Sequence, residues 1–398
     1  MCNGTIMNKL ISFSIPLMLS GILQLMFNAV DIVVVGRFSG SQALAAVGST
    51  TALINVFTNL FIGISLGANV LAARYYAAGK TKEMLETVHT AIALALVSGV
   101  AMAVIGVVFA RGALEIMGTP DDVIAKSTLY MRIYFCGMPF FMMYNYGAAI
   151  LRAVGDTKRP LIFLIVSGVI NAVLNLFLVI GFHLDVAGVG IATVISQLVS
   201  CILVLRCLHH TESSYQLHLA KLRIRSVYLK QIFEVGVPAG IQSTVINISN
   251  AMLQSSVNSF GSIAMAGYTA SNNIFGFLYV SVNSFTQACM SFTSQNYGVK
   301  KLKRMDRVLI DCMILSVVVT LILGSSVYIF GPELLHIYSN QADVIKYGME
   351  IFSYTTVTYF LCGLMDLFPG ALRGMGYSTV PMILSIIGTV GVRIIWIY

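Results

Sequence analysis

LRAVG at residues 151–155 returns as LRGMG at residues 372–376, and a proline follows each segment, at Pro160 and Pro381. The offset between the two copies is 221 residues. Two further pairs keep this offset to within one residue, namely Asp122-Val123-Ile124 with Asp343-Val344-Ile345, and Pro16 with Pro238. In an apolar chain, such a duplication is typical of a transporter with two halves around a central site.

The composition indicates a membrane protein. Of the 398 residues, 57% are apolar and only 10% are charged, and the mean hydropathy is +0.86. A soluble chain of this length needs more charge to cover its surface. Apolar runs long enough to cross a bilayer predict eleven spans, at residues 10–36, 43–70, 88–110, 127–151, 160–182, 186–207, 231–258, 262–292, 308–330, 347–371 and 380–398.

The basic residues predict the orientation of these spans. With a cytoplasmic N-terminus, 18 of the 24 Lys and Arg residues fall in inner loops, as the positive-inside rule requires. The net charge of +8 therefore sets topology and attracts anionic lipid, and does not indicate a nucleic-acid partner. We expect a multi-pass protein of the cell membrane.

A polar stretch divides the chain into two halves. Residues 208–230 form the longest such stretch and read as a cytoplasmic linker between an N-terminal lobe, 1–207, and a C-terminal lobe, 231–398. Six spans precede the linker, so both lobes enter the membrane in the same direction and the repeat is parallel. The fold predicted is all-α, with two six-helix lobes, and the repeat implies that a twelfth span is missing from this sequence.

The first span carries the candidate coupling residue. Ser20, Gln24, Asn28 and Asp31 fall on one helical face. A carboxylate at the bilayer centre costs about 2.5–3.5 kcal/mol on insertion scales, and less toward the edge. Asp31 therefore faces protein or water, either as a proton or cation site or as a structural hydrogen-bonding group at a helix end.

Two later spans of the first half offer partners for that carboxylate. One face of the fifth span carries polar residues at intervals of four, namely Ser167, Asn171 and Asn175. In the sixth span, Thr193 and Gln197 have the same spacing and also share a face. Their oxygens could ring a small cation or relay a proton. The alternative is ordinary hydrogen bonding between packed helices.

The second half is rich in amides. Gln242 and Asn272 are candidates for lining a substrate cavity, together with Gln24 and Asn28. Asp366 is a further candidate for this cavity. Asp366 and Arg393 are the ionisable residues deep in this half; each could contact substrate or form part of a gate, and the two could pair with each other. The alternative for Asp366 is a charge at the inner face, close to Arg373. Pro16 lies near the start of the first span, where it is either a hinge or a helix-start proline.

The sequence gives no support for an enzyme. The seven Cys have no paired spacing, and the six His form no metal-binding motif. No nucleophile with a neighbouring base is visible in the spans. We expect no cofactor, and no metal beyond a possible Na⁺ at Asp31.

Together these features resemble the multidrug and toxic compound extrusion (MATE) family, through NAVD at residues 28–31, ALAAVG at 43–48 and LRAVGDT at 151–157. The resemblance covers the chain from Pro16 onward. It implies twelve helices in two lobes, and export of organic, often cationic compounds in exchange for H⁺ or Na⁺. Such a protein acts on small molecules within the lipid bilayer, and we expect a monomer.

The same resemblance assigns residues. It implies that Asp31 is the coupling carboxylate, that Asn171 and Thr193 are its partners, and that Pro16 allows the first helix to bend. Asn175 stands where many DinF-like members have a second Asp, and Ile246 stands near the Glu of the NorM-like branch. The resemblance is to a prokaryotic member, closer to the DinF-like than to the NorM-like branch. The remaining alternatives are a flippase for a lipid-linked substrate and a sensor that binds ligands without transport.

Overall fold

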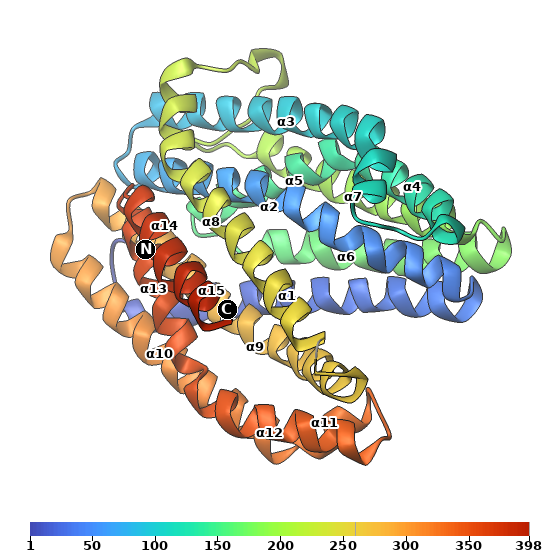
Figure 1. Cartoon of the computed structure of the whole chain (residues 1–398). Coiled ribbons are helices and arrows are strands. Elements are labelled where there is room, and N and C mark those ends of the chain that lie inside the picture. Colours follow the sequence, from blue (N-terminus) through green and yellow to red (C-terminus); the bar gives the residue numbers. More distant parts are fainter. Residues whose placement is uncertain (259, 398) are drawn as a thin grey trace. The chain divides into compact units, whose positions relative to one another are not determined.

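The computed structural model describes residues 1–258 and 260–397, which are helical almost throughout and contain no strand (Figure 1). The first-half elements are α1 (Ile6–Phe38), α2 (Ser41–Ala77), α3 (Thr81–Ile116), α4 (Asp121–Cys136), α5 (Met138–Ala153), α6 (Lys158–Leu176), η1 (Phe177–Gly181) and α7 (Asp185–His210). The others are η2 (Leu219–Lys221), α8 (Ser226–Asn258), α9 (Ser262–Gly298), α10 (Leu302–Ile329), α11 (Gly331–His336), α12 (Ala342–Thr358), α13 (Phe360–Gly374), α14 (Thr379–Ser385), η3 (Ile386–Gly391) and α15 (Val392–Ile397).

Each predicted span coincides with one of these helices or with a consecutive group of them. Within the described ranges, seven helices are long and apolar enough to cross a membrane, or eight if the bent pair α12–α13 counts as one. The amide-rich helices α8 and α9 lie outside that set, because Asn and Gln side chains lower their hydropathy.

Two predicted spans are not single helices. The span predicted at 127–151 is divided into α4 and α5 at Gly137. The span predicted at 347–371 is bent by 47° between α12 and α13. Hydropathy detects the apolar length of a segment and carries little information about a break in its axis.

The chain packs as two compact units. One comprises Met1–Gly21 with Ile241–Tyr398, and the other comprises Ile22–Gly240. The boundaries therefore fall inside α1 and α8. In the first unit, Leu10, Phe13 and Leu17 of α1 join an apolar core with residues of α9, α10 and α13. The predicted lobes, 1–207 and 231–398, follow the sequence repeat, and that division stays a prediction.

The turns after α5 and α13 show the repeat in atomic detail. Gly155 and Gly376 adopt φ values of 100° and 96°. The amide of Gly155 donates to the Arg152 carbonyl at 3.0 Å, and that of Gly376 donates to the Arg373 carbonyl at 2.8 Å. In each turn the next amide donates to the carbonyl of the residue five positions before it, at 2.9 Å. Both turns are Schellman caps, in which only glycine is free of strain.

In a second pair of equivalent turns, one left-handed position is occupied by a lysine instead of a glycine. Gly79 has φ of 68° after α2, and its equivalent after α9 is Lys300, with φ of 57°. A left-handed conformation costs a non-glycine residue about 1–2 kcal/mol. Lys300→Gly is therefore expected to raise the apparent Tm of the purified protein. Lys303→Gly, in the first turn of α10, is the matched control and should not raise Tm, because Lys303 already has a helical backbone and glycine lowers helix propensity. A lower Tm for Lys300→Gly would contradict the expectation.

Glycines allow α2 to cross α8 with the backbones in contact. Gly63 and Gly67 lie one turn apart on α2, and Gly236 and Gly240 lie one turn apart on α8. A Cβ at Gly67 would collide with the carbonyl oxygen of Ile232, and one at Gly63 would collide with the Gly240 backbone. This spacing of small residues on both helices is typical of close crossings in membranes.

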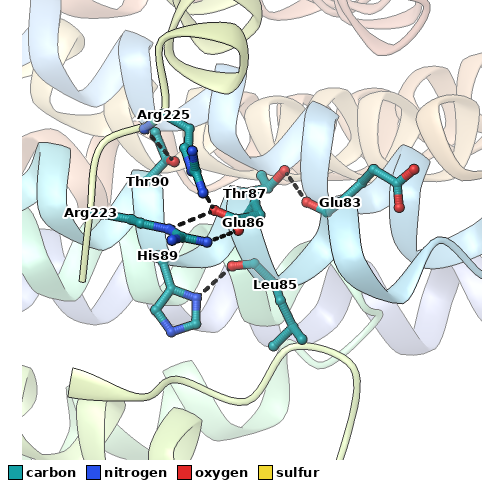
Figure 2. A network of polar contacts seen from close by, with 8 residues as sticks. All are labelled: Glu83, Leu85, Glu86, Thr87, His89, Thr90, Arg223 and Arg225. Atoms are coloured by element: carbon teal, nitrogen blue, oxygen red, sulfur yellow. Dashed lines mark hydrogen bonds and ion pairs between the residues drawn. The ribbon is translucent and has the colours of Figure 1, made fainter. Parts of the chain in front are cut away.

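The linker is docked on α3 by polar contacts (Figure 2). The Glu86 carboxylate accepts hydrogen bonds from Arg223 and lies 3.4 Å from the Arg225 guanidinium. The backbone amide of Arg225 donates to the Thr90 hydroxyl at 3.3 Å. His89 is buried, and its Nε2 accepts the His218 backbone amide at 3.1 Å. The linker is therefore an ordered part of its unit.

Candidate functional site

The structure brings together the four residues predicted to couple ion binding to transport. Asp31 on α1 accepts a hydrogen bond from the Nδ2 of Asn175 on α6. The same nitrogen donates to Asn171 Oδ1 at 3.1 Å, and Asn171 Nδ2 donates to Thr193 Oγ1 on α7 at 3.5 Å. The Thr193 hydroxyl donates in turn to the Val189 carbonyl at 2.9 Å. We call Asp31, Asn171, Asn175 and Thr193 the Asp31 cluster.

The Asp31 cluster holds a carboxylate beside an unused acceptor. Asn175 is fully buried and Asn171 nearly so, whereas Asp31 is only partly buried. The Asn175 Oδ1 atom is buried and has no hydrogen-bond donor among the described residues. A buried acceptor without a donor costs free energy. A proton on Asp31 or a bound cation would supply the missing partner, since both favour carboxylate and amide oxygens.

Local sequence explains why α1 lies against α6 at this level. Gly168 on α6 has no side chain, and a Cβ there would collide with the ring of Phe27 on α1. Directly after Asn175 the helix widens into the π-helical segment η1, Phe177–Gly181. Such segments weaken the regular hydrogen-bond ladder and often occur at functional sites.

Two tyrosines near the site were not predicted from the sequence. Tyr130 and Tyr134 on α4 lie within electrostatic reach of Asp31, and their ring centroids are 6.1 Å apart. Their spacing of four residues on one helix was the available signal. Tyrosine is so common in apolar cores that this spacing did not distinguish them.

The other first-half candidates lie elsewhere on α1. Gln24 and Asn28 are exposed and belong to the unit of Ile22–Gly240. Pro16 is buried in the helix interior, so it is not a helix-start proline. The Ser20 hydroxyl donates to the Pro16 carbonyl at 2.8 Å. A proline in a helix interior removes one backbone hydrogen bond and favours a kink.

In the second half, Gln242 is buried and engaged at both ends of its amide. Its Oε1 accepts a hydrogen bond from Arg373, and its Nε2 donates to Ser385 Oγ at 2.8 Å. Asn272 is exposed on α9, and Asp366 is half-buried on α13. Gln242 therefore contacts protein groups through all of its polar atoms, whereas Asn272 remains open to its surroundings.

The suggested ion pair between Asp366 and Arg393 does not form among the described residues. Arg393 Nη1 donates instead to Ser249 Oγ at 3.1 Å and to Asn250 Oδ1 at 2.7 Å, both on α8. Asp366 lies close to Arg373 on its own helix. Helical spacing alone could not show that α15 packs its arginine against α8.

Comparison with known proteins places the chain among transporters. The MatE family pattern matches residues 16–177 and again 238–398. The Probable multidrug resistance protein YoeA of Bacillus subtilis is 30% identical over 389 residues, which cover 96% of this chain and 84% of YoeA. The Multidrug export protein MepA of Staphylococcus aureus is 21% identical over 96% of this chain and 84% of its own length.

Solved structures agree in fold. An outward-facing MATE family transporter of the MOP superfamily superposes with a TM-score of 0.91 at 20% identity, covering 96% of this chain and 86% of the other. A variant of the MATE transporter VcmN from Vibrio cholerae gives 0.90 at 19% identity, with 96% and 86% covered. The two-lobe helical fold predicted from the sequence is confirmed. The chain belongs to the MatE family and is a multi-pass membrane transporter rather than an enzyme.

Proposed function

We propose that this protein exports organic compounds, often cationic, from the cell in exchange for an ion that occupies the Asp31 cluster. The observation that carries the proposal is a partly exposed carboxylate hydrogen-bonded to Asn175, whose own oxygen has no donor within the part of the chain that the structure describes. The relatives YoeA and MepA are named as multidrug resistance and multidrug export proteins, which supports a drug-like cargo.

Exchange requires that ion and cargo compete, directly or through the conformation they favour. Asp31 supplies the one formal charge of its cluster. An ion at this carboxylate removes its attraction for a cationic compound, and loss of the ion restores it. Alternation between inward-open and outward-open states then couples the two movements, and bending of α1 at Pro16 gives a route for Asp31 to change its surroundings.

Transport in proteoliposomes tests this function. A proton gradient and a sodium gradient are imposed in separate experiments. We expect one of them to drive rhodamine 6G against its concentration gradient, and this movement to stop when an ionophore collapses the imposed gradient. The gradient that works identifies the coupling ion. Equal dye movement with and without both gradients would refute ion exchange.

A further inference from the structure

Arg393 is a charged group in a spanning segment with most of its donors unused. It is half-buried on α15, and within residues 1–258 and 260–397 only its Nη1 makes hydrogen bonds, to Ser249 and Asn250. We call these three residues the Arg393 cluster. Nε and Nη2 have no acceptor in the described part of the chain. A guanidinium stays charged under all physiological conditions, so at membrane depth it faces water or pairs with acidic groups or carbonyl oxygens.

The repeat shows which first-half position Arg393 occupies. Offsets of 221 relate Pro160 to Pro381, ahead of the π-helical segment η3 at Ile386–Gly391. A π-helical turn accommodates an extra residue, so the offset beyond η3 becomes 222 and aligns Arg393 with Asn171. The same offset, which holds for Pro16 and Pro238, aligns Asn250 with Asn28. The Arg393 cluster is thus the second-half counterpart of the contact between α1 and α6.

The two equivalent places carry opposite charge. The Asp31 cluster has one carboxylate with amide and hydroxyl partners. The Arg393 cluster has one guanidinium with amide and hydroxyl partners, and its α8 partners include no acid. Among the residues that the structure describes, neither Arg393 nor Arg373 forms an ion pair. Arg373 also keeps its Nε buried without an acceptor.

Hydrogen bonds from a guanidinium to an oxyanion are charge-assisted, and can be bidentate through the free Nε and Nη2 edge. Carboxamide oxygens, the present partners, are weaker acceptors. We propose that the Arg393 cluster binds the oxyanion, such as a carboxylate, of the exported compound, so that the substrates include zwitterionic organic molecules. This inference rests on the proposed export function, but concerns a different residue and a different charge.

Binding of two dyes to the purified full chain tests it without any ion gradient. Rhodamine 6G is a cationic ethyl ester, and rhodamine 19 is the corresponding free acid, so the pair differs in one carboxylate. We expect the affinity ratio of rhodamine 19 to rhodamine 6G, measured by fluorescence anisotropy in phosphatidylcholine nanodiscs, to fall about tenfold in Arg393→Gln. Arg393→Lys keeps the charge and should retain most of the ratio.

Arg111→Gln is the matched control, because it removes an arginine that is exposed and paired with Glu115. Its affinity ratio should equal that of the parent. An unchanged ratio in Arg393→Gln, or no rhodamine 19 binding to the parent, would overturn the proposal. Displacement of rhodamine 19 by adding phosphatidylglycerol to the nanodisc would also overturn it, since a lipid headgroup would then occupy the cluster. Failure of ion-driven export with an intact ratio would count against the proposed function alone.

Discussion

Replacing Asp31 with asparagine is expected to reduce the rate of ion-driven export about 100-fold. Coupling free energies between binding sites typically correspond to effects of about 5- to 150-fold, so this loss is near their upper end. The asparagine Oδ1 can still accept the Asn175 amide, so the contact between α1 and α6 is retained and the protein should fold. The charge that attracts a cation or holds a proton is lost. Initial rates in proteoliposomes under the effective gradient measure the loss, and size-exclusion profiles check folding.

Two further variants make this result specific to the site. Glu115→Gln removes an acid that is exposed and paired with Arg111, and should leave the rate within about twofold of the parent, since surface ion pairs contribute little. Asn175→Asp places a second carboxylate against Asp31. Two carboxylates in contact favour uptake of a proton or cation. The dependence of the export rate on proton or sodium concentration should therefore change. Full, gradient-dependent export by Asp31→Asn would refute the assignment of Asp31.

A methyl group at Gly67 is expected to prevent the close crossing of α2 and α8. In Gly67→Ala, the new Cβ collides with the carbonyl oxygen of Ile232, which is backbone and cannot rotate away. Overpacking of this kind typically costs about 1–3 kcal/mol, occasionally more. We expect a marked loss of monodisperse protein in detergent and a lower Tm in what remains.

Gly112→Ala provides the matched comparison, because apart from its chain neighbours and the backbone of its own helix, no atom of the described residues lies within 4 Å of the position that its Cβ would take. Alanine favours a helix over glycine by up to about 1 kcal/mol, so this variant should be as stable as the parent or slightly more so. Equal yields and Tm values for the two variants would show that α2 and α8 do not depend on backbone contact.

The sequence predicted the parts of the fold that depend on length and periodicity. Within the described residues, the predicted apolar segments lie in helices, and the turns after Arg152 and Arg373 match as the repeat requires, because span length and Schellman glycines are local requirements. The break at Gly137 was missed. Pro139, at the start of α5, was a local signal for it, because proline has no N–H for the helical hydrogen bond.

For the Asp31 cluster, spacing of four residues predicted that Asn171 and Asn175 share a face, and the family resemblance pointed that face toward Asp31. The hydrogen-bond order and the unused oxygen of Asn175 required coordinates. The suggested pairing of Arg393 with Asp366 was wrong, because the sequence shows opposite charges but not which helices are adjacent. The docking of the linker was missed because Tyr215 and Leu217, which are buried, stand among polar residues typical of a solvated loop.

The division of α1 between two packing units has a consequence for biosynthesis. Residues 1–21 are translated before Ile22–Gly240, yet the rest of the unit that contains them begins only at Ile241. Leu10, Phe13 and Leu17 find their apolar neighbours only after α9 has been translated. The nascent chain must therefore keep residues 1–21 in lipid, or bound by the insertion machinery, until α9 has been made.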